Sequence, residues 1–137
     1  SDYRFVEEVS KGKAEQGLIG EGSRRITRKL HHAFIKRSRQ ASVVVSSLST
    51  SPYPVIVCGD FNDTPLSYAY HKISRGLVDA FVQSGRGLGN TFSGKLPPLR
   101  IDFILTSPHL TSHDFKVHGI RQSDHYPISA IITVRGD

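Results

Sequence analysis

The stretch that most constrains the fold is Val55–Asp63, which reads Val-Ile-Val-Cys-Gly-Asp-Phe-Asn-Asp. Four apolar residues that run into Gly59 and Asp60 are typical of a buried strand that ends at a polar site. In open α/β sheets, ligands bind beyond the carboxyl ends of such strands. A simple turn is the alternative interpretation, because Gly, Asn and Asp are common turn formers. The stretch therefore predicts an α/β chain in which Asp60 is the first group to leave the sheet.

Length and composition limit the architecture and the classes of partner. At 137 residues the chain is long enough for one domain with a sizeable core, and its hydrophobic fraction of 37% is ordinary for a globular protein. No apolar run approaches the ~20 residues that a membrane span needs, so we expect no membrane span. The net charge of +6 favours anionic partners, with nucleic acid or another phosphate-bearing substrate as the obvious class.

The single cysteine and the first residue bear on the context of the chain. Cys58 lies within the apolar run, so the sequence excludes an intrachain disulfide and a cysteine-based metal site. We interpret Cys58 as a small core residue. The sequence starts with Ser1 rather than Met, and we expect that upstream sequence is missing.

Hydrophobic periodicity predicts helices on both sides of the central stretch. A long helix is expected from an N-cap at Ser23 to about Leu48, with apolar residues along one face. Its opposite face carries a basic stripe: Arg25, Arg28, Lys29, His32, Lys36 and Arg39. Such a stripe can follow a phosphate backbone, but a solvated helix face is the favoured interpretation. A second helix is predicted to start at Thr64 and Pro65 and to end near Gly76.

Further strands are predicted in the C-terminal part of the chain. Residues 100–105 alternate so that three apolar side chains share one face while Arg100 and Asp102 lie on the other. Charged groups in an apolar strand need partners, and the simplest interpretation is that the two satisfy each other or a nearby loop. Residues 113–120 and 126–134 are expected to form two more strands.

Three polar motifs stand at strand ends or within strands: Gly59–Asn62 (Gly-Asp-Phe-Asn), Arg100–Asp102 (Arg-Ile-Asp) and Ser123–His125 (Ser-Asp-His). In this order they resemble the C-terminal motifs of the endonuclease/exonuclease/phosphatase superfamily, the divalent-metal-dependent phosphoesterases that include DNase I-like nucleases. The resemblance is specific from Val55 to Val134. It implies half of a DNase I-like four-layer α/β sandwich, with mainly antiparallel sheet and flanking helices. Residues 1–137 would then be the C-terminal part of a single domain.

The resemblance also implies a role for each polar residue in phosphate-ester hydrolysis. Asp60 would hold and activate the attacking water, and Asn62 would position that water or donate a hydrogen bond to the phosphoryl group. Asp102 would accept a proton from one ring nitrogen of His125, so that the other nitrogen donates to the phosphate. Asp124 would bind or orient a metal ion, Mg²⁺ or Mn²⁺, which acts as Lewis acid and template.

Two parts of the family pattern have no match in this chain. The N-terminal half of the superfamily domain contributes an Asn and a metal-binding Glu at strand ends, and a His or Tyr motif comes from the middle. The N-terminal glutamates here stand in helical or loop contexts instead: Glu7, Glu8, Glu15 and Glu21. We therefore expect a Mg²⁺- or Mn²⁺-dependent phosphoric-ester hydrolase whose fragment alone is inactive or very weak. The missing N-terminal half of the same protein, or another chain, would cover the sheet.

Two alternatives belong to other functional classes. The first is a non-catalytic module that keeps the superfamily fold to bind nucleic acid or a protein. The second is a DNA-binding domain that works through the basic helix face. The intact set of site residues argues against simple decay of the enzyme: Asp60, Asn62, Asp102, Asp124 and His125.

Overall fold

A computed structural model describes residues 21–94, 97–120 and 122–135. The elements run in the order α2 (Glu21–Ser49), β1 (Ile56–Asp60), α3 (Tyr68–Ile73), β2 (Val78–Asp79), α4 (Ala80–Ser84), β3 (Asp102–Thr106), β4 (Leu110–Val117) and β5 (Ile128–Val134). Strands β1, β3 and β2 form one antiparallel sheet, and β4 pairs with β5 in a second antiparallel sheet. This mixed α/β architecture of antiparallel sheets and flanking helices confirms the predicted fold class.

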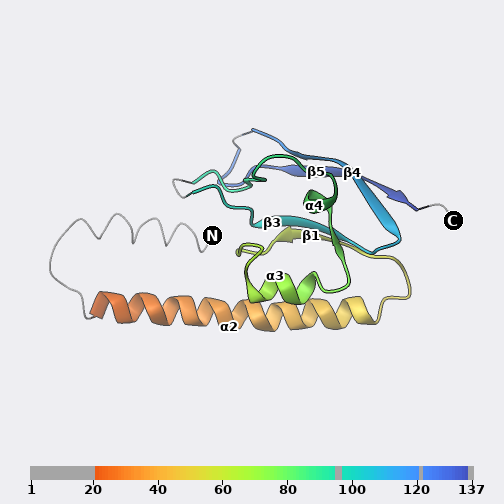
Figure 1. Ribbon diagram of the computed structural model, residues 1–137. Helices are drawn as coiled ribbons and strands as arrows, with labels where there is room; N and C mark the ends of the chain where they lie inside the picture. The colour runs from red at the N-terminus through yellow and green to blue at the C-terminus, as the bar shows by residue number, and fades with distance from the viewer. Residues whose placement is uncertain (1–20, 95–96, 121, 136–137) are drawn as a thin grey trace.

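The first sheet lies between helices α2 and α3 on one face and α4 with the second sheet on the other (Figure 1). Phe103 and Leu105 of β3 are fully buried and pack with residues of α2 and α3 in one core cluster. Ile104 points to the other face, where it packs with Ala80 of α4 and Phe115 of β4. The alternation along β3 therefore divides the core in two, and β3 is the central strand of the first sheet.

Both helices differ in their bounds from the prediction. α2 starts at Glu21 rather than Ser23 and ends at Ser49. α3 starts later than predicted because Ser67, not Thr64, is its N-cap: the Ser67 hydroxyl accepts from the Tyr70 N–H at 3.1 Å. The carbonyl of Thr64 instead accepts from the Ser67 N–H at 3.0 Å, so the chain makes a turn before the helix.

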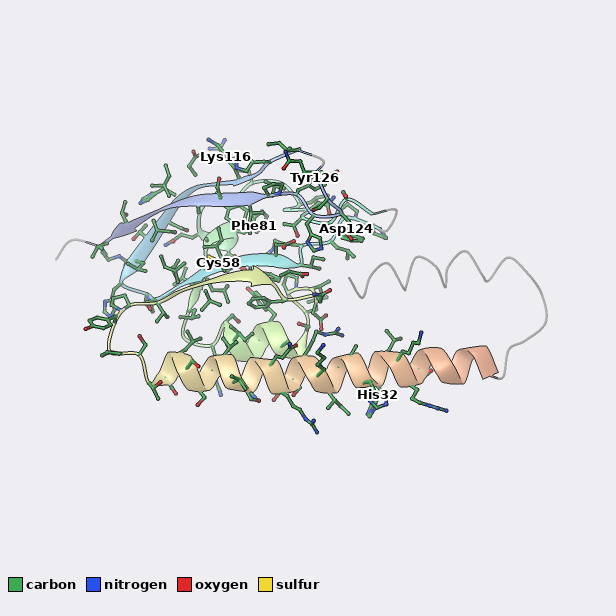
Figure 2. All side chains as sticks on the ribbon, turned by 180° about the vertical axis from the view of Figure 1, so that it is seen from behind. His32, Cys58, Phe81, Lys116, Asp124 and Tyr126 are labelled. Atoms are coloured by element: carbon green, nitrogen blue, oxygen red, sulfur yellow. The ribbon has the colours of Figure 1, made fainter. Side chains whose placement is uncertain are left out.

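The described side chains of the predicted basic stripe on α2 are exposed, as a solvated helix face requires: Arg28, Lys29, His32, Lys36 and Arg39. Arg25 lies outside the described side chains. Figure 2 shows His32 on the side of α2 that points away from the sheets. Across residues 21–94, 97–120 and 122–135, no helix combines the length and the apolar character that crossing a membrane requires.

Strand β1 is less buried than its apolar sequence predicts. It pairs with β3 on one side and, within the described part of the chain, with no strand on the other. Ile56 is 49% exposed, and Cys58 is exposed as well. The interpretation of Cys58 as a core residue is therefore wrong. The physical reason is that β4 and β5 pack against Ile104 of β3, on one face of the first sheet, but leave Ile56 and Cys58 of β1 accessible.

Of the two partners considered for Arg100, the neighbouring Asp102 and a nearby segment, the structure excludes Asp102. Arg100 Nη1 lies 2.6 Å from Asp79 Oδ2, both side chains are buried, and the guanidinium lies 4.7 Å from the ring centroid of Phe103. The Tyr70 hydroxyl donates to the same Asp79 oxygen at 2.8 Å. Burial, together with that hydrogen bond, raises the pKa of Tyr70 to about 12, so the phenol stays a neutral donor. Asp102 is thereby left available to a different partner.

Candidate active site

The final rung of the β1–β3 ladder places two carboxylates side by side. Asp60 is the last residue of β1, Asp102 is the first of β3, and the register pairs them directly. Directly opposed residues of an antiparallel pair project from the same face, where like charges destabilise the sheet. This rung therefore requires a positive or proton-donating group beside it.

His125 is that group. Its Nδ1 lies 2.9 Å from Asp102 Oδ2, a hydrogen bond in which the imidazole N–H donates, and its Nε2 lies 3.8 Å from Asp60 Oδ2. The second distance is too long for a hydrogen bond but within the range of an ion pair. The histidine thus bridges the two carboxylates, bound to one of them and close to the other.

Local structure around the Ser-Asp-His motif holds the histidine in place. The Ser123 hydroxyl accepts from the backbone N–H of His125 at 2.9 Å and donates to its carbonyl at 3.1 Å. An isolated antiparallel bridge joins His125 to Phe92, whose ring lies edge-on at 5.8 Å between centroids. Short-range and long-range contacts therefore both fix the imidazole beside the carboxylate rung.

Asn62 orients Asp60. The Asn62 backbone N–H donates to Asp60 Oδ1 at 2.7 Å, and its side-chain amide donates to Oδ2 at 2.8 Å. The φ angle of Asn62 is 49°, a left-handed conformation that Asn tolerates better than most residues. This conformation directs both donors back toward Asp60, so the turn that follows β1 sets the direction of the carboxylate.

The charge state of Asp60 reflects its surroundings. Burial raises the pKa of Asp60 above its ordinary value, and the negative charge of Asp102 acts in the same direction. The Asn62 N–H and the nearby His125 oppose the rise but do not cancel it. An ionised Asp60 is therefore a stronger base than an ordinary aspartate, which suits a group that takes a proton from water.

The same three residues offer a candidate metal-binding group. One ligand atom from each of Asp60, Asp102 and His125 lies within 4.8 Å of the others. Two carboxylate oxygens with one imidazole nitrogen suit a divalent cation such as Mn²⁺ or Mg²⁺. Asp124, the predicted metal ligand, lies next to His125 in the chain but is not in this group, and its carbonyl accepts from Ser93 at 2.9 Å. Its metal role stays a prediction.

The structure thus brings four of the five predicted site residues together: Asp60, Asn62, Asp102 and His125. It also shows a residue that the sequence analysis missed. Thr91 is fully buried, and its hydroxyl oxygen accepts from the backbone N–H of Ile101 at 3.0 Å and of Asp102 at 3.1 Å. Because these contacts span ten residues or more, no local sequence pattern signals them.

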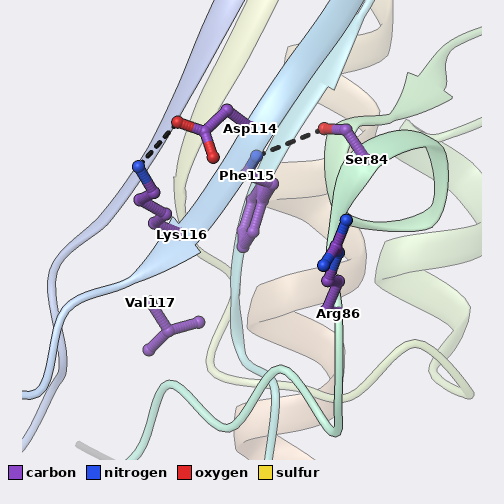
Figure 3. A pocket seen from close by; sticks show the side chains of 6 residues that line it. All are labelled: Ser84, Arg86, Asp114, Phe115, Lys116 and Val117. Carbon is purple, nitrogen blue, oxygen red and sulfur yellow. Dashed lines mark hydrogen bonds and ion pairs between the residues drawn. The ribbon is translucent and has the colours of Figure 1, made fainter.

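A separate cavity lies apart from this cluster. It has a volume of about 640 Å³ and is lined by Ser84, Arg86, Asp114, Phe115, Lys116 and Val117 (Figure 3). Its lining side chains come from β4 and from the region at the end of α4. Asp114 is a residue of β4 and lies where the pairing of β4 with β5 is irregular. It shares no residue with the carboxylate rung, so the candidate chemistry does not depend on it.

Comparison with known proteins places this geometry in a family. The model of the Endonuclease/Exonuclease/phosphatase family matches residues 23–125. Among curated proteins, none matches the chain significantly. A solved endonuclease/exonuclease/phosphatase from Bacteroides vulgatus is 26% identical with a TM-score of 0.62, and the alignment covers 72% of this chain and 44% of that chain.

Two further solved structures share the fold. A mannosyl-6-phosphatase from Bacteroides thetaiotaomicron is 24% identical with a TM-score of 0.59, and the alignment covers 71% of this chain and 45% of that chain. A functionally unknown conserved protein from Enterococcus faecalis is 20% identical with a TM-score of 0.61, at 72% and 44% coverage. The chain therefore spans less than half the length of these structures. Because the family match covers most of its residues, the chain belongs to the Endonuclease/Exonuclease/phosphatase family.

Proposed function

We propose that the chain carries the water-activating and phosphate-binding side of a metal-dependent phosphoesterase site. The observation that carries the proposal is the convergence of Asp60, Asp102 and His125 at one end of the first sheet. Members of the family generally hydrolyse phosphate esters, and two adjacent carboxylates with a bridging histidine supply the base and the phosphate-binding donor for that reaction.

The side chains divide the proton transfers. Asp60, whose pKa is raised by burial, accepts a proton from the attacking water. The water oxygen bonds to phosphorus, the ester P–O bond breaks, and the leaving alkoxide takes a proton from solvent. Asp102 holds the Nδ1 proton of His125, so that a protonated Nε2 donates to a phosphoryl oxygen. The Asn62 amide keeps Asp60 aligned and adds a polar donor at the same place. Each role is the one that the family motifs imply for the residue.

The donor set fits the metal that the family typically uses. Carboxylate oxygens predominate at the rung, where Asp60 and Asp102 could hold the cation. The family motif implies that Asp124, next to His125 in the chain, would be a further ligand. A bound Mg²⁺ or Mn²⁺ supplies Lewis-acid neutralisation of charge on the phosphoryl oxygens. The carboxylates that oppose each other across the β1–β3 ladder would also repel each other less beside a cation.

We also propose that the rest of the same domain covers the open edge of β1. A cavity of about 260 Å³ runs between β1 and α2, with Ala41 and Val44 on the helix side and Val57 and Asp60 on the strand side. An unpaired edge strand accepts another strand through its backbone hydrogen-bonding groups. The solved relatives are more than twice as long as the region aligned with this chain. A protein of similar length would have enough further residues to add such a strand.

The substrate is proposed as a phosphate monoester or diester. The net charge of +6 suits an anionic substrate, and one structural neighbour is a mannosyl-6-phosphatase, so a sugar 6-phosphate is a sensible first monoester to test. A nucleic-acid diester tests the other substrate class. Binding without turnover in both assays would favour the non-catalytic module.

The test uses the full-length protein with p-nitrophenyl phosphate, mannose 6-phosphate and a DNA duplex, each with Mg²⁺ or Mn²⁺. Chelation should abolish hydrolysis, and added metal should restore it. His125→Ala should lower kcat about 10²- to 10⁴-fold, the usual contribution of acid–base assistance. His118→Ala is the matched control, because its Nε2 is hydrogen-bonded to Ser129 on β5 at 2.8 Å, outside the cluster. Undiminished activity of His125→Ala would contradict the assigned role.

A further inference from the structure

We propose that Thr91 is a positioning residue that aligns Asp102 with His125. The inference rests on the proposed function for its catalytic consequence, but its structural part does not. Thr91 does not reach the carboxylates itself. It contacts the backbones of the two segments that carry the reactive pair, one through its side chain and the other through its carbonyl group.

The hydroxyl of Thr91 fixes the start of β3. Its Oγ1 accepts from the N–H groups of Ile101 and Asp102, at 3.0 and 3.1 Å, and the residue is 0% exposed. A hydroxyl oxygen has two lone pairs, so one atom can satisfy both donors. Without it, two N–H groups would lie buried with no acceptor, and the backbone beneath the Asp102 carboxylate would have to move to recover one.

The backbone of the same segment fixes the histidine. The carbonyl of Thr91 accepts from the Tyr126 N–H at 2.8 Å, one residue beyond His125. The next residue, Phe92, forms the antiparallel bridge with His125 and places its ring edge-on to the imidazole. Residues 91 and 92 therefore connect β3 to the Ser-Asp-His segment, and the 2.9 Å bond between Asp102 and His125 spans that connection.

Two substitutions at Thr91 separate the hydroxyl from the volume of the side chain. Thr91→Val keeps the shape and removes the acceptor, whereas Thr91→Ser keeps the acceptor and removes a methyl group. Thr106→Val is the matched control, because Thr106 is equally buried at the other end of β3 and its hydroxyl has no hydrogen-bond partner among the described residues. Only Thr91→Val should disturb the reactive pair.

In the full-length enzyme, Thr91→Val should lower kcat about 10- to 100-fold, the range for a displaced catalytic group, with KM changed by less than about twofold. Thr91→Ser should stay within about threefold of the parent and rescue what Val loses, and Thr106→Val should be silent. A raised KM with an unchanged kcat in Thr91→Val would overturn the proposal. So would a Ser variant as impaired as the Val variant.

A second measurement does not depend on turnover. In protein with ¹⁵N-labelled histidine, the Nδ1–H of His125 should give a proton resonance protected by Asp102 in the parent, Thr91→Ser and Thr106→Val, and lost in Thr91→Val. If the parent hydrolyses nothing but the resonance follows this pattern, the proposed function fails and the positioning role stands. If Thr91→Val keeps the resonance, the positioning role fails. If Thr91→Val does not fold, loss of the resonance in folded Thr91→Ser would still refute the proposal, and its retention would support it.

Discussion

Replacing Asp102 with Asn removes one negative charge from the carboxylate rung and keeps the shape of the side chain. The charge lies 2.9 Å from His125 Nδ1, and the two side chains are 16% and 21% exposed, so solvent screens their interaction only in part. A hydrogen bond to a charged group contributes about 1.5–3 kcal/mol. At about 1.4 kcal/mol for each factor of ten, losing that contribution in the transition state lowers kcat about 10- to 150-fold.

The same substitution has a second consequence, on the pH dependence. The pKa of Asp60 is raised chiefly by burial and further by the charge of Asp102. Removing that charge lowers the pKa of Asp60 and leaves the burial in place. A base with a lower pKa stays ionised at lower pH, so the acidic limb of the kcat/KM profile should move to lower pH in Asp102→Asn.

The assay is hydrolysis of p-nitrophenyl phosphate by the full-length protein with Mn²⁺, followed across the acidic limb. Asp114→Asn is the control: Asp114 is an exposed aspartate on β4 that pairs with Lys116 at 2.6 Å, and it should leave both kcat and the profile unchanged. A variant with normal kcat would refute the role of the Asp102–His125 bond. An acidic limb that moved to higher pH would refute the electrostatic coupling of Asp102 to Asp60.

Two stability predictions follow from the described contacts. The pKa of Asp60 is higher in the folded state than in the unfolded state. Between these two pKa values the folded state binds more protons, so the free energy of unfolding falls as the pH rises from the lower value to the higher one. Asp60→Asn should therefore raise the free energy of urea unfolding at pH 7, with the gain shrinking as pH falls toward about 4, the ordinary aspartate value; a gain that grew on acidification would contradict the sign. Arg100→Met leaves Asp79 buried without its cation and should lower that free energy by about 3–5 kcal/mol, and a loss below about 1 kcal/mol would show that the pair is not buried in solution.

Local pattern was enough to predict that strands lie in the C-terminal part, because alternation with a period of two is typical of a strand. It did not give all their bounds: β4 runs from Leu110 to Val117 rather than over residues 113–120, and its pairing with β5 is irregular between His113 and Lys116. In β3, the apolar residues that alternate along the strand are buried, and Ile128, Ala130 and Ile132 of β5 pack toward the core. The three polar motifs were likewise visible as interruptions of apolar runs. The structure brings Asp60, Asp102 and His125 together, while the catalytic roles assigned to them stay predictions.

The errors share a different cause, which is contact across long stretches of chain. Cys58 reads as a core residue from its neighbours, but its burial depends on what covers β1, and the described residues leave it exposed. Arg100 pairs with Asp79, 21 residues earlier, rather than with its near neighbour Asp102. The Thr91 hydroxyl accepts hydrogen bonds from residues that follow it by ten or more positions. A pattern with a short period carries no information on any of these partners.

Two features that destabilise the fold lie together at the end of β1. Their position separates the Asp60 side of the proposed site from the His125 side. The carboxylate rung brings like charges together, and the strand edge beside it is unpaired within the described residues. Natural proteins keep such features where function or a partner compensates for them. The cavity beside the open edge is lined by Asp60. His125, by contrast, is already held by Phe92 and Ser123, and the neighbouring Tyr126 is bonded to the Thr91 carbonyl. The rest of the domain should therefore enter the site next to Asp60, where a base still needs a metal and a substrate, and should leave the histidine as this chain has placed it.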